Sequence, residues 1–199
     1  RDVHVRADAG GGLARVVLEQ RFDNVHSDPL AATYQLPLPA DGAVVGFSFQ
    51  IGEQRIVGEI DRKHHARQRY EEALAQGRTA AILEQDRSSL FTQELGNIPP
   101  GVSITAEIII EQPLAWRQDG WEWRFPTVVA PRFVSAGTPD AERTSVDVAD
   151  GPMAATARLT MAIRDALTGE ISSPSHALSG DAQALTLPVG APLDRDLVV

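Results

Sequence analysis

Residues 102–111, with the sequence VSITAEIIIE, decide the fold, because apolar and polar side chains alternate along them. Successive side chains of a β-strand point to opposite sides, so alternate residues share a face. One face therefore carries five apolar residues: Val102, Ile104, Ala106, Ile108 and Ile110. The stretch predicts a strand with one side in a hydrophobic core.

The segment just before this strand has the composition of a tight turn. Pro100 suits the first central position of a turn, and Gly101 tolerates the positive φ of the second. We expect a structural turn that sets the register of the strand beginning at Val102. It is built from Gly96, Asn97, Pro99, Pro100 and Gly101.

The same two-residue period recurs along the chain. It is found in residues 13–22, 44–51, 121–125 and 157–163. One predicted face carries Val45, Phe47, Phe49 and Ile51, and another carries Trp121, Trp123 and Phe125. Short alternating strands separated by Pro- and Gly-rich turns are typical of an all-β protein, and here they predict an antiparallel β-sandwich.

Residues 61–76 break this pattern and predict the chain's one amphipathic helix. They contain good helix formers and neither Gly nor Pro. Asp61 suits the N-cap and Gly77 the C-terminal stop. One apolar stripe is formed by Ala66, Tyr70, Ala73 and Leu74. We expect the helix, near residues 62–76, to lie on the sandwich by this stripe.

Composition excludes several classes of function. The net charge of −9 argues against a nucleic-acid-binding surface, and no run approaches the ~18 apolar residues of a membrane span. The absence of cysteine excludes disulfides and Cys-ligated metals. The basic residues are Arg except for Lys63, and this bias favours a bacterial source. A cell-envelope or secreted location is favoured over the cytoplasm.

Several ordered blocks resemble the VIT domain (vault protein inter-alpha-trypsin domain). Residues 32–39, ATYQLPLP, are similar to the family's Y-x-F/L-P-L-P block, and residues 66–73, ARQRYEEA, to its A-x-x-x-Y-x-x-A helix. The most specific block is GNIPPG at residues 96–101. The motifs RFPT and PRF, at residues 124–127 and 131–133, close the resemblance. It covers about residues 1–133.

The resemblance implies a β-sandwich with one helix, no known catalysis and a role in protein contacts. Such domains commonly precede a von Willebrand factor type A domain, which we expect as the partner in the same full-length chain. Residues 134–199 either complete the sandwich or bridge to that next domain, with a short strand expected at Ser145–Val148. The strand-like tail Leu197–Val199 is expected to present an apolar patch for docking.

Candidate chemistry is sparse. His64 and His65 are neighbours on the predicted helix and point about 100° apart, so they favour a solvated face over a metal site. With Trp116 they are candidate partner contacts. Acid pairs such as Asp23 with Asp28 lack the spacing of a calcium loop. Residues 10–12, GGG, lack a phosphate-binding pattern and predict a flexible turn. We therefore expect no cofactor, metal or catalytic residue.

Two alternatives to an interaction module stay open. A carbohydrate-binding sandwich would use Trp116, Trp121 and Trp123 as a stacking surface, which requires that these rings be exposed. A hydrolase of unfamiliar type would need converging acid, base or nucleophile groups, and Ser88–Ser89 near Asp86 is a weak candidate. Because Trp121 and Trp123 share a strand face, we expect both rings in the core.

Overall fold

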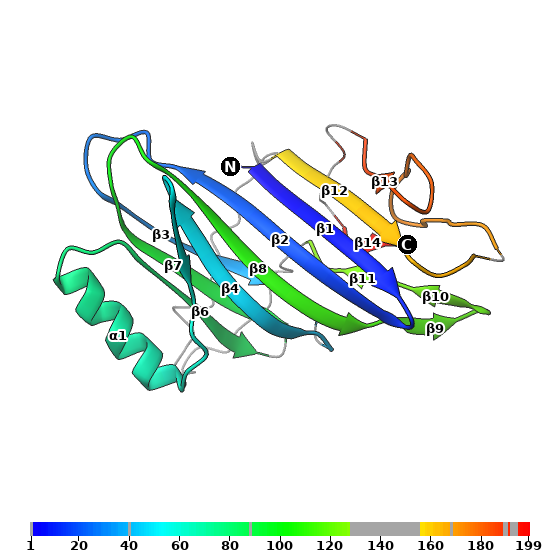
Figure 1. The fold of residues 1–199 in the computed structure, drawn as a ribbon, viewed down its shortest axis with the longest axis horizontal. Helices are drawn as coiled ribbons and strands as arrows, with labels where there is room; N and C mark the ends of the chain where they lie inside the picture. The colour runs from blue at the N-terminus through cyan, green and yellow to red at the C-terminus, as the bar shows by residue number, and fades with distance from the viewer. Residues whose placement is uncertain are drawn as a thin grey trace, which may run out of the picture.

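The computed structural model describes residues 2–39, 41–87, 89–127, 156–167, 169–188, 191 and 195–199 (Figure 1). Strands dominate it, and it contains one helix among these residues. The elements are β1 (Asp2–Gly10), β2 (Leu13–Asp23), β3 (Leu30–Pro37), β4 (Ala43–Ile51), β5 (Gln54–Val57), α1 (Lys63–Ala75), β6 (Ala80–Arg87), β7 (Leu90–Ile98), β8 (Ser103–Pro113), β9 (Ala115–Arg117), β10 (Gly120–Glu122), β11 (Arg124–Phe125), β12 (Thr156–Ile163), β13 (Leu185–Thr186) and β14 (Leu197–Val198).

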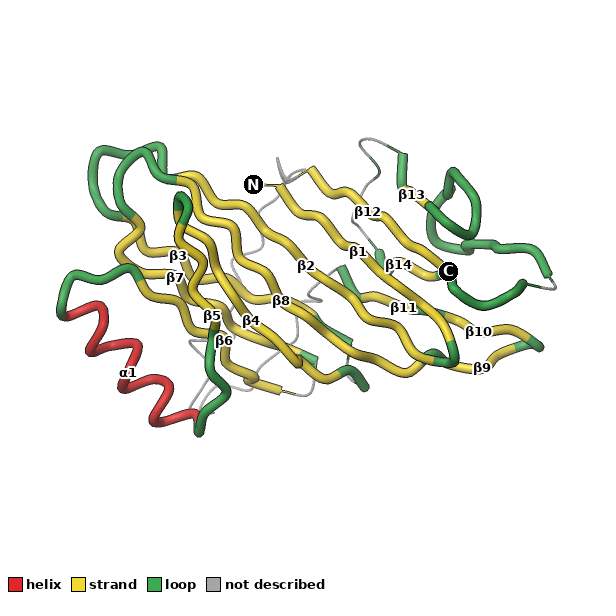
Figure 2. The backbone as a smooth tube through the Cα atoms, in the orientation of Figure 1, coloured by secondary structure: helices red, strands yellow, loops and turns green. Residues whose placement is uncertain are grey.

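The larger sheet has seven strands in the order β13-β12-β1-β2-β8-β4-β5 (Figure 2). Its neighbours are antiparallel except β1 and β12, which are parallel from Asp2↔Thr156 to Ala9↔Ile163. The smaller sheet has the order β3-β7-β6. The prediction of a mainly β fold with a single helix is confirmed, and the parallel pair is the one departure from an antiparallel pattern among the named strand pairs.

The predicted strand at residues 102–111 lies at the centre of the larger sheet. It is β8, which pairs with β2 on one side and β4 on the other. Ile104, Ala106 and Ile108 are fully buried, as is Val16 of β2. The other face of these strands, which is turned to solvent, carries cross-strand ion pairs. In one of them a guanidinium nitrogen of Arg15 lies 2.5 Å from the Glu111 carboxylate. The two-residue period therefore separates core from solvent, as predicted.

One strand departs from its predicted face. In β4, Val44 pairs with Ile110 and Gly46 with Ile109, so that Val45 is an extra residue in the ladder. Val45 is 43% exposed, whereas it was expected to share a buried face with Phe47. A bulge of this kind shifts the side-chain alternation by one residue. The sequence pattern hides it because both faces of this strand contain apolar residues.

The helix covers the outer face of the smaller sheet (Figure 1). The stripe of Ala66, Tyr70, Ala73 and Leu74 faces inward as predicted, with Tyr70 buried. Gly96 of β7 makes this close approach possible, since a Cβ there would lie 3.0 Å from the Tyr70 hydroxyl and would collide with Leu74. The molecule is thus three layers deep at this end: large sheet, small sheet and helix.

The two ends of the helix differ in how well they were predicted. Gly77 has φ +72, and the amides of Gly77 and Arg78 donate to Leu74 and Ala73. This is the expected glycine stop in the form of a Schellman motif. The N-cap is Arg62 and not Asp61. The Asp61 carboxylate instead accepts from the amide of Arg62 at 2.7 Å. Arg62 precedes the first helical turn, so this hydrogen bond does not cap the helix.

A partly buried ion triad fixes the helix to the sheet. Arg67 donates to both carboxylate oxygens of Glu94, at 2.7 and 2.8 Å, and also to Glu84. The Glu84 side chain is only 4% exposed. Hydrogen bonds from Arg67 to Glu94 and Glu84 raise the pKa of the guanidinium, so it stays charged. Burial, with the nearby Glu94 charge, raises the pKa of Tyr70 to about 12.

The predicted turn divides into two parts with different roles. Gly101 has φ +69, and the Val102 amide donates to Pro99 O at 3.3 Å, so Pro99–Val102 is the turn. Gly96 and Asn97 were also assigned to this turn, but they lie in β7. Asn97, with φ 54, donates from its side chain to the carbonyl oxygens of Leu74 and Arg78. It therefore ties the helix C-terminus to β7.

Asn24 makes the hydrogen bonds that fix the Pro99–Val102 turn, and the sequence analysis assigned it no such role. It is 2% exposed, and its side chain donates to Asp28 O, Ile98 O and Pro99 O. Its backbone exchanges hydrogen bonds with Val102 and Gly101. A buried polar side chain is stable only when its hydrogen bonds are made, so Asn24 fixes where β7 ends and β8 begins.

The C-terminal third completes the fold. β12 and β13 extend the larger sheet, and β14 pairs with β11. The tail was expected to expose an apolar patch, but Leu197 is 1% and Val198 6% exposed, because their side chains join the core. The strand expected at Ser145–Val148 and the motif at residues 131–133 lie outside the described residues.

We predict that Gly101→Val lowers the free energy of unfolding by about 1 kcal/mol or more, because a branched side chain is strained at positive φ. Chemical denaturation measures this. Gly169→Ala is the control, since nothing lies within 4 Å of a Cβ there and its φ is not positive. An unchanged midpoint for Gly101→Val contradicts a structural role for the turn.

We predict that Arg67→Ala destabilises the fold by about 2 kcal/mol or more, because it removes this cation from the buried Glu84 and the half-buried Glu94. The matched control is Arg69→Ala, two residues along the same helix, whose ion pair with Glu59 is exposed. Thermal and denaturant unfolding of the two variants should differ clearly. Equal midpoints would show that the triad contributes nothing to stability.

Candidate interaction surface

The hairpin of β9 and β10 carries an exposed pair of tryptophans. Its turn residues Gln118 and Asp119 have φ 47 and 66, the signs that a two-residue type I′ turn requires. The strands then place Trp116 directly opposite Trp121. The rings meet edge to face, with centroids 4.9 Å apart and planes at 81°. Trp116 is 59% and Trp121 49% exposed.

The hairpin rests on the glycine turn between β1 and β2. A Cβ at Gly12 would lie 3.1 Å from the Trp121 ring, and the φ of Gly12 is +79. The Leu114 amide donates to Gly12 O at 2.8 Å. The glycines at residues 10–12 were expected to form a flexible turn. They do form a turn, and Gly12 also allows the indole to pack against the backbone.

Only one of the two tryptophans expected in the core is buried there. Trp123 is 1% exposed, and its ring stacks on that of Phe125 with the two centroids 5.8 Å apart. Trp121 lies two residues nearer the hairpin turn, past the edge of the core and over Gly12. Sharing a strand face therefore did not give the two rings the same burial.

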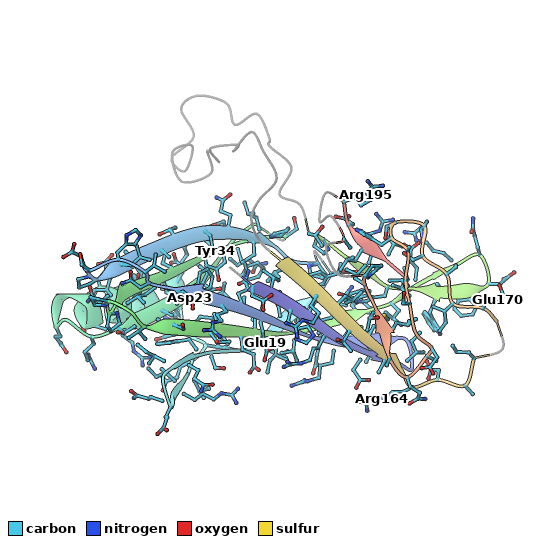
Figure 3. The ribbon with its side chains drawn as sticks, turned by 90° about the horizontal axis from the view of Figure 1, so that it is seen from above. Glu19, Asp23, Tyr34, Arg164, Glu170 and Arg195 are labelled. Carbon is cyan, nitrogen blue, oxygen red and sulfur yellow. The ribbon has the colours of Figure 1, made fainter. Side chains whose placement is uncertain are left out.

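We use the name aromatic tip for the exposed pair Trp116 and Trp121. The Gly11 amide donates to the Asp165 carboxylate, at 2.9 and 3.1 Å. The loop after β12, with Glu170, lies at the same end of the molecule as β9 and β10 (Figures 1 and 3). The tip is thus an exposed, apolar pair of rings supported by the turn between β1 and β2.

Charged side chains border the aromatic tip. Arg117 lies 3.3 Å and Arg124 3.7 Å from the Glu122 carboxylate. All three side chains keep contact with solvent, so these pairs contribute little to stability. An apolar centre with a polar, charged border is the arrangement found in protein interfaces.

The predicted contacts on the helix lie far from this tip, at the other end of the molecule (Figure 1). His64 and His65 are exposed, and their ring centroids are 4.0 Å apart, closer than two divergent neighbours were expected to be. Within the described residues, no group of three His, Asp or Glu side chains converges to hold a metal ion. Because the helix and the aromatic tip lie at opposite ends of the molecule, His64 and His65 do not share a surface with Trp116.

Ser175 and His176 form a pair that sequence reasoning missed. The His176 Nδ1 atom lies 2.9 Å from the Ser175 hydroxyl. The same hydroxyl accepts from the Val198 amide at 2.9 Å. Of the two serines considered as nucleophiles in the sequence, Ser88 is outside the described residues, and the Ser89 carbonyl oxygen accepts from the Leu38 amide at 3.1 Å. No helix among the described residues has the length and apolarity needed to span a membrane.

Comparison with known proteins gives relatives for most of the chain. Mono-ADP-ribosyltransferase PARP4 of Mus musculus is 35% identical over 129 residues, 65% of this chain and 7% of that protein. Von Willebrand factor A domain-containing protein 5A of Homo sapiens is 30% identical over 199 residues, 93% of this chain and 25% of that protein. The chain therefore spans a quarter or less of these relatives. Both are eukaryotic, so the bacterial source stays a prediction.

The solved structure of an M1 zinc metallopeptidase from Deinococcus radiodurans aligns with a TM-score of 0.36 and 13% identity, covering 99% of this chain and 40% of that one. A score at this level does not establish a shared fold. The vault protein inter-alpha-trypsin domain family matches residues 1–110, more than half of the chain. The chain belongs to the VIT domain family.

Proposed function

We propose that this chain is a non-catalytic protein-interaction module of a larger protein with VIT and type A domains, and that the aromatic tip is its contact surface. The observation that carries the proposal is the exposure of Trp116 and Trp121 on a rigid hairpin. The relatives named as containing a von Willebrand factor A domain support a type A domain as the partner.

The physical case rests on the residue type and its preparation for binding. Tryptophan is enriched among the residues that contribute most to interface affinity. Trp116 and Trp121 already hold each other edge to face, and Trp121 is seated on Gly12. Little side-chain entropy is then lost when a partner covers them. A pair fixed in this way favours a specific contact over incidental exposure.

A carbohydrate-binding module is the second candidate, because two of the three tryptophans are exposed as that alternative requires. Sugars stack on the open face of an aromatic ring. The two planes stand at 81°, so the pair offers no shared flat platform for successive sugar units. This perpendicular arrangement favours a protein partner over a sugar chain that would stack along parallel rings.

The hydrolase alternative has weaker support. Its best candidate is Ser175 beside His176, but the Ser175 hydroxyl is engaged by the backbone of Val198 in β14. The buried carboxylate of Glu84 and the half-buried carboxylate of Glu94 are held by Arg67. Both groups therefore have structural roles in the described residues, which supports a module without catalysis.

We predict that Trp116→Ala raises the Kd for the type A domain of the same protein by about tenfold or more, the loss expected for a hot-spot tryptophan. Isothermal titration calorimetry with the separately produced domain measures it. The matched control is Val25→Ala. Val25 is 83% exposed, and its loop between β2 and β3 is at the opposite end of the molecule (Figure 1).

Two results would count against the proposal. If Trp116→Ala binds as tightly as the unchanged protein, the aromatic tip is not the contact surface. If soluble oligosaccharides bind the unchanged protein and Trp116→Ala abolishes that binding, the carbohydrate-binding alternative replaces it. Circular dichroism of each variant checks that the fold is retained.

A further inference from the structure

The end of the chain is paired next to the aromatic tip. Val199 and Trp123 exchange both backbone hydrogen bonds, at 2.8 and 2.9 Å. Leu197 and Val198 pair in the antiparallel direction with Phe125 and Arg124. Each later residue of this segment therefore pairs with an earlier residue of its partner strand, and the next partners in this order are Glu122 and Trp121. Figure 1 shows the C-terminus close to β10 and β11.

The backbone of Trp121 points to the same edge as that of Trp123. In an antiparallel ladder, residues two apart direct their N–H and C=O groups to the same side. The pairing Arg117↔Gly120 closes the two-residue turn, so Gly120 and Glu122 face β9 and Trp121 faces away from it. Among the described residues, β10 has β9 as its only strand neighbour. Its other edge has no strand neighbour among these residues, and we call it the open edge.

We propose that the residues following Val199 in the full-length protein continue β14 along this open edge of β10. The inference rests on the proposed function, in which the chain is one domain of a longer protein. In this register, the first residue after Val199 lies opposite Glu122. The second lies opposite Trp121 and exchanges both backbone hydrogen bonds with it.

The structure prepares β14 for this continuation. The outward N–H and C=O groups of Val198 are both engaged by the Ser175 hydroxyl, at 2.9 and 3.4 Å. The strand is therefore fixed from both sides up to its last residue, and its direction leads onto β10. An edge with unpaired backbone groups favours the addition of a strand.

The continuation has a consequence for the aromatic tip. Directly opposed side chains in a sheet have Cβ atoms about 5 Å apart. The side chain of the second residue after Val199 would then lie against Trp121. The connection to the next domain becomes a strand of this one, and it delivers that domain beside Trp116 and Trp121.

Hydrogen exchange measured by NMR tests the proposal on two chains. One ends at Val199, and the other is extended by the natural residues that follow. The Trp121 amide should exchange about tenfold more slowly, or slower still, in the longer chain. The Glu122 amide, which faces β9 in both chains, should be unchanged and serves as the internal control. Equal exchange of Trp121 in the two chains overturns the proposal.

Two proline substitutions in the longer chain sharpen the test. Proline at the second residue after Val199 removes the N–H that would donate to the Trp121 carbonyl, and it should return the Trp121 amide to fast exchange. Proline at the first residue, whose N–H points away from β10, is the control and should leave Trp121 protected. Identical exchange in the two variants overturns the predicted register.

These readouts separate this inference from the proposed function. Weaker binding of Trp116→Ala together with unprotected Trp121 keeps the aromatic tip as a contact surface and rejects the strand continuation. Protection of Trp121 with unchanged binding of Trp116→Ala keeps the continuation and rejects the tip.

Discussion

Eleven consecutive residue pairs join β2 to β8, from Leu13↔Pro113 to Asp23↔Ser103, and the larger sheet is assembled on both sides of this pair. A shift of one residue in this register would move every buried side chain to the solvent face. Ile104, Ile108 and Val16 are fully buried, so the hydrophobic effect opposes such a shift strongly. The register of the central pair is therefore the constraint on which the other layers depend.

One polar side chain holds that register at its end, and a second ties the helix to the smaller sheet. Asn24 makes its hydrogen bonds just where β2 leaves the sheet, and it links this point to the Pro99–Gly101 turn. Asn97 does the same for the helix, by binding the carbonyl oxygens at the helix C-terminus from β7. Asn24 is buried, so it adds specificity, because another register would leave its side chain without partners.

The two ends of the molecule have different physical characters. At the helix end, Arg67 satisfies buried carboxylates and the outer helix face is polar. At the other end, the aromatic tip keeps Trp116 and Trp121 exposed on a hairpin that α1 does not cover. A surface that exposes tryptophan risks unwanted association. Trp121 is seated on Gly12, and charged residues lie at the border of the tip.

The sequence alone determined the strand faces in β2, β8 and β12, the apolar stripe of the helix, its Gly77 stop and the turn at Pro100–Gly101. These features depend on local periodicity and backbone preference, which neighbouring residues specify. The family resemblance likewise needed only ordered short motifs. Arg67 was recoverable in principle, since it lies three residues before Tyr70 on the inward side of the helix.

Tertiary structure decided what depends on contacts between distant segments. The bulge at Val45 follows from the register against Ile109 and Ile110, and the exposure of Trp121 follows from where the core ends. Glu84 and Glu94 become one site with Arg67 only when β6, β7 and the helix are stacked. The tail Leu197–Val198 is buried because β11 accepts it as a strand. Sequence periodicity carries no information on which strands become neighbours, and these four outcomes depend on that arrangement.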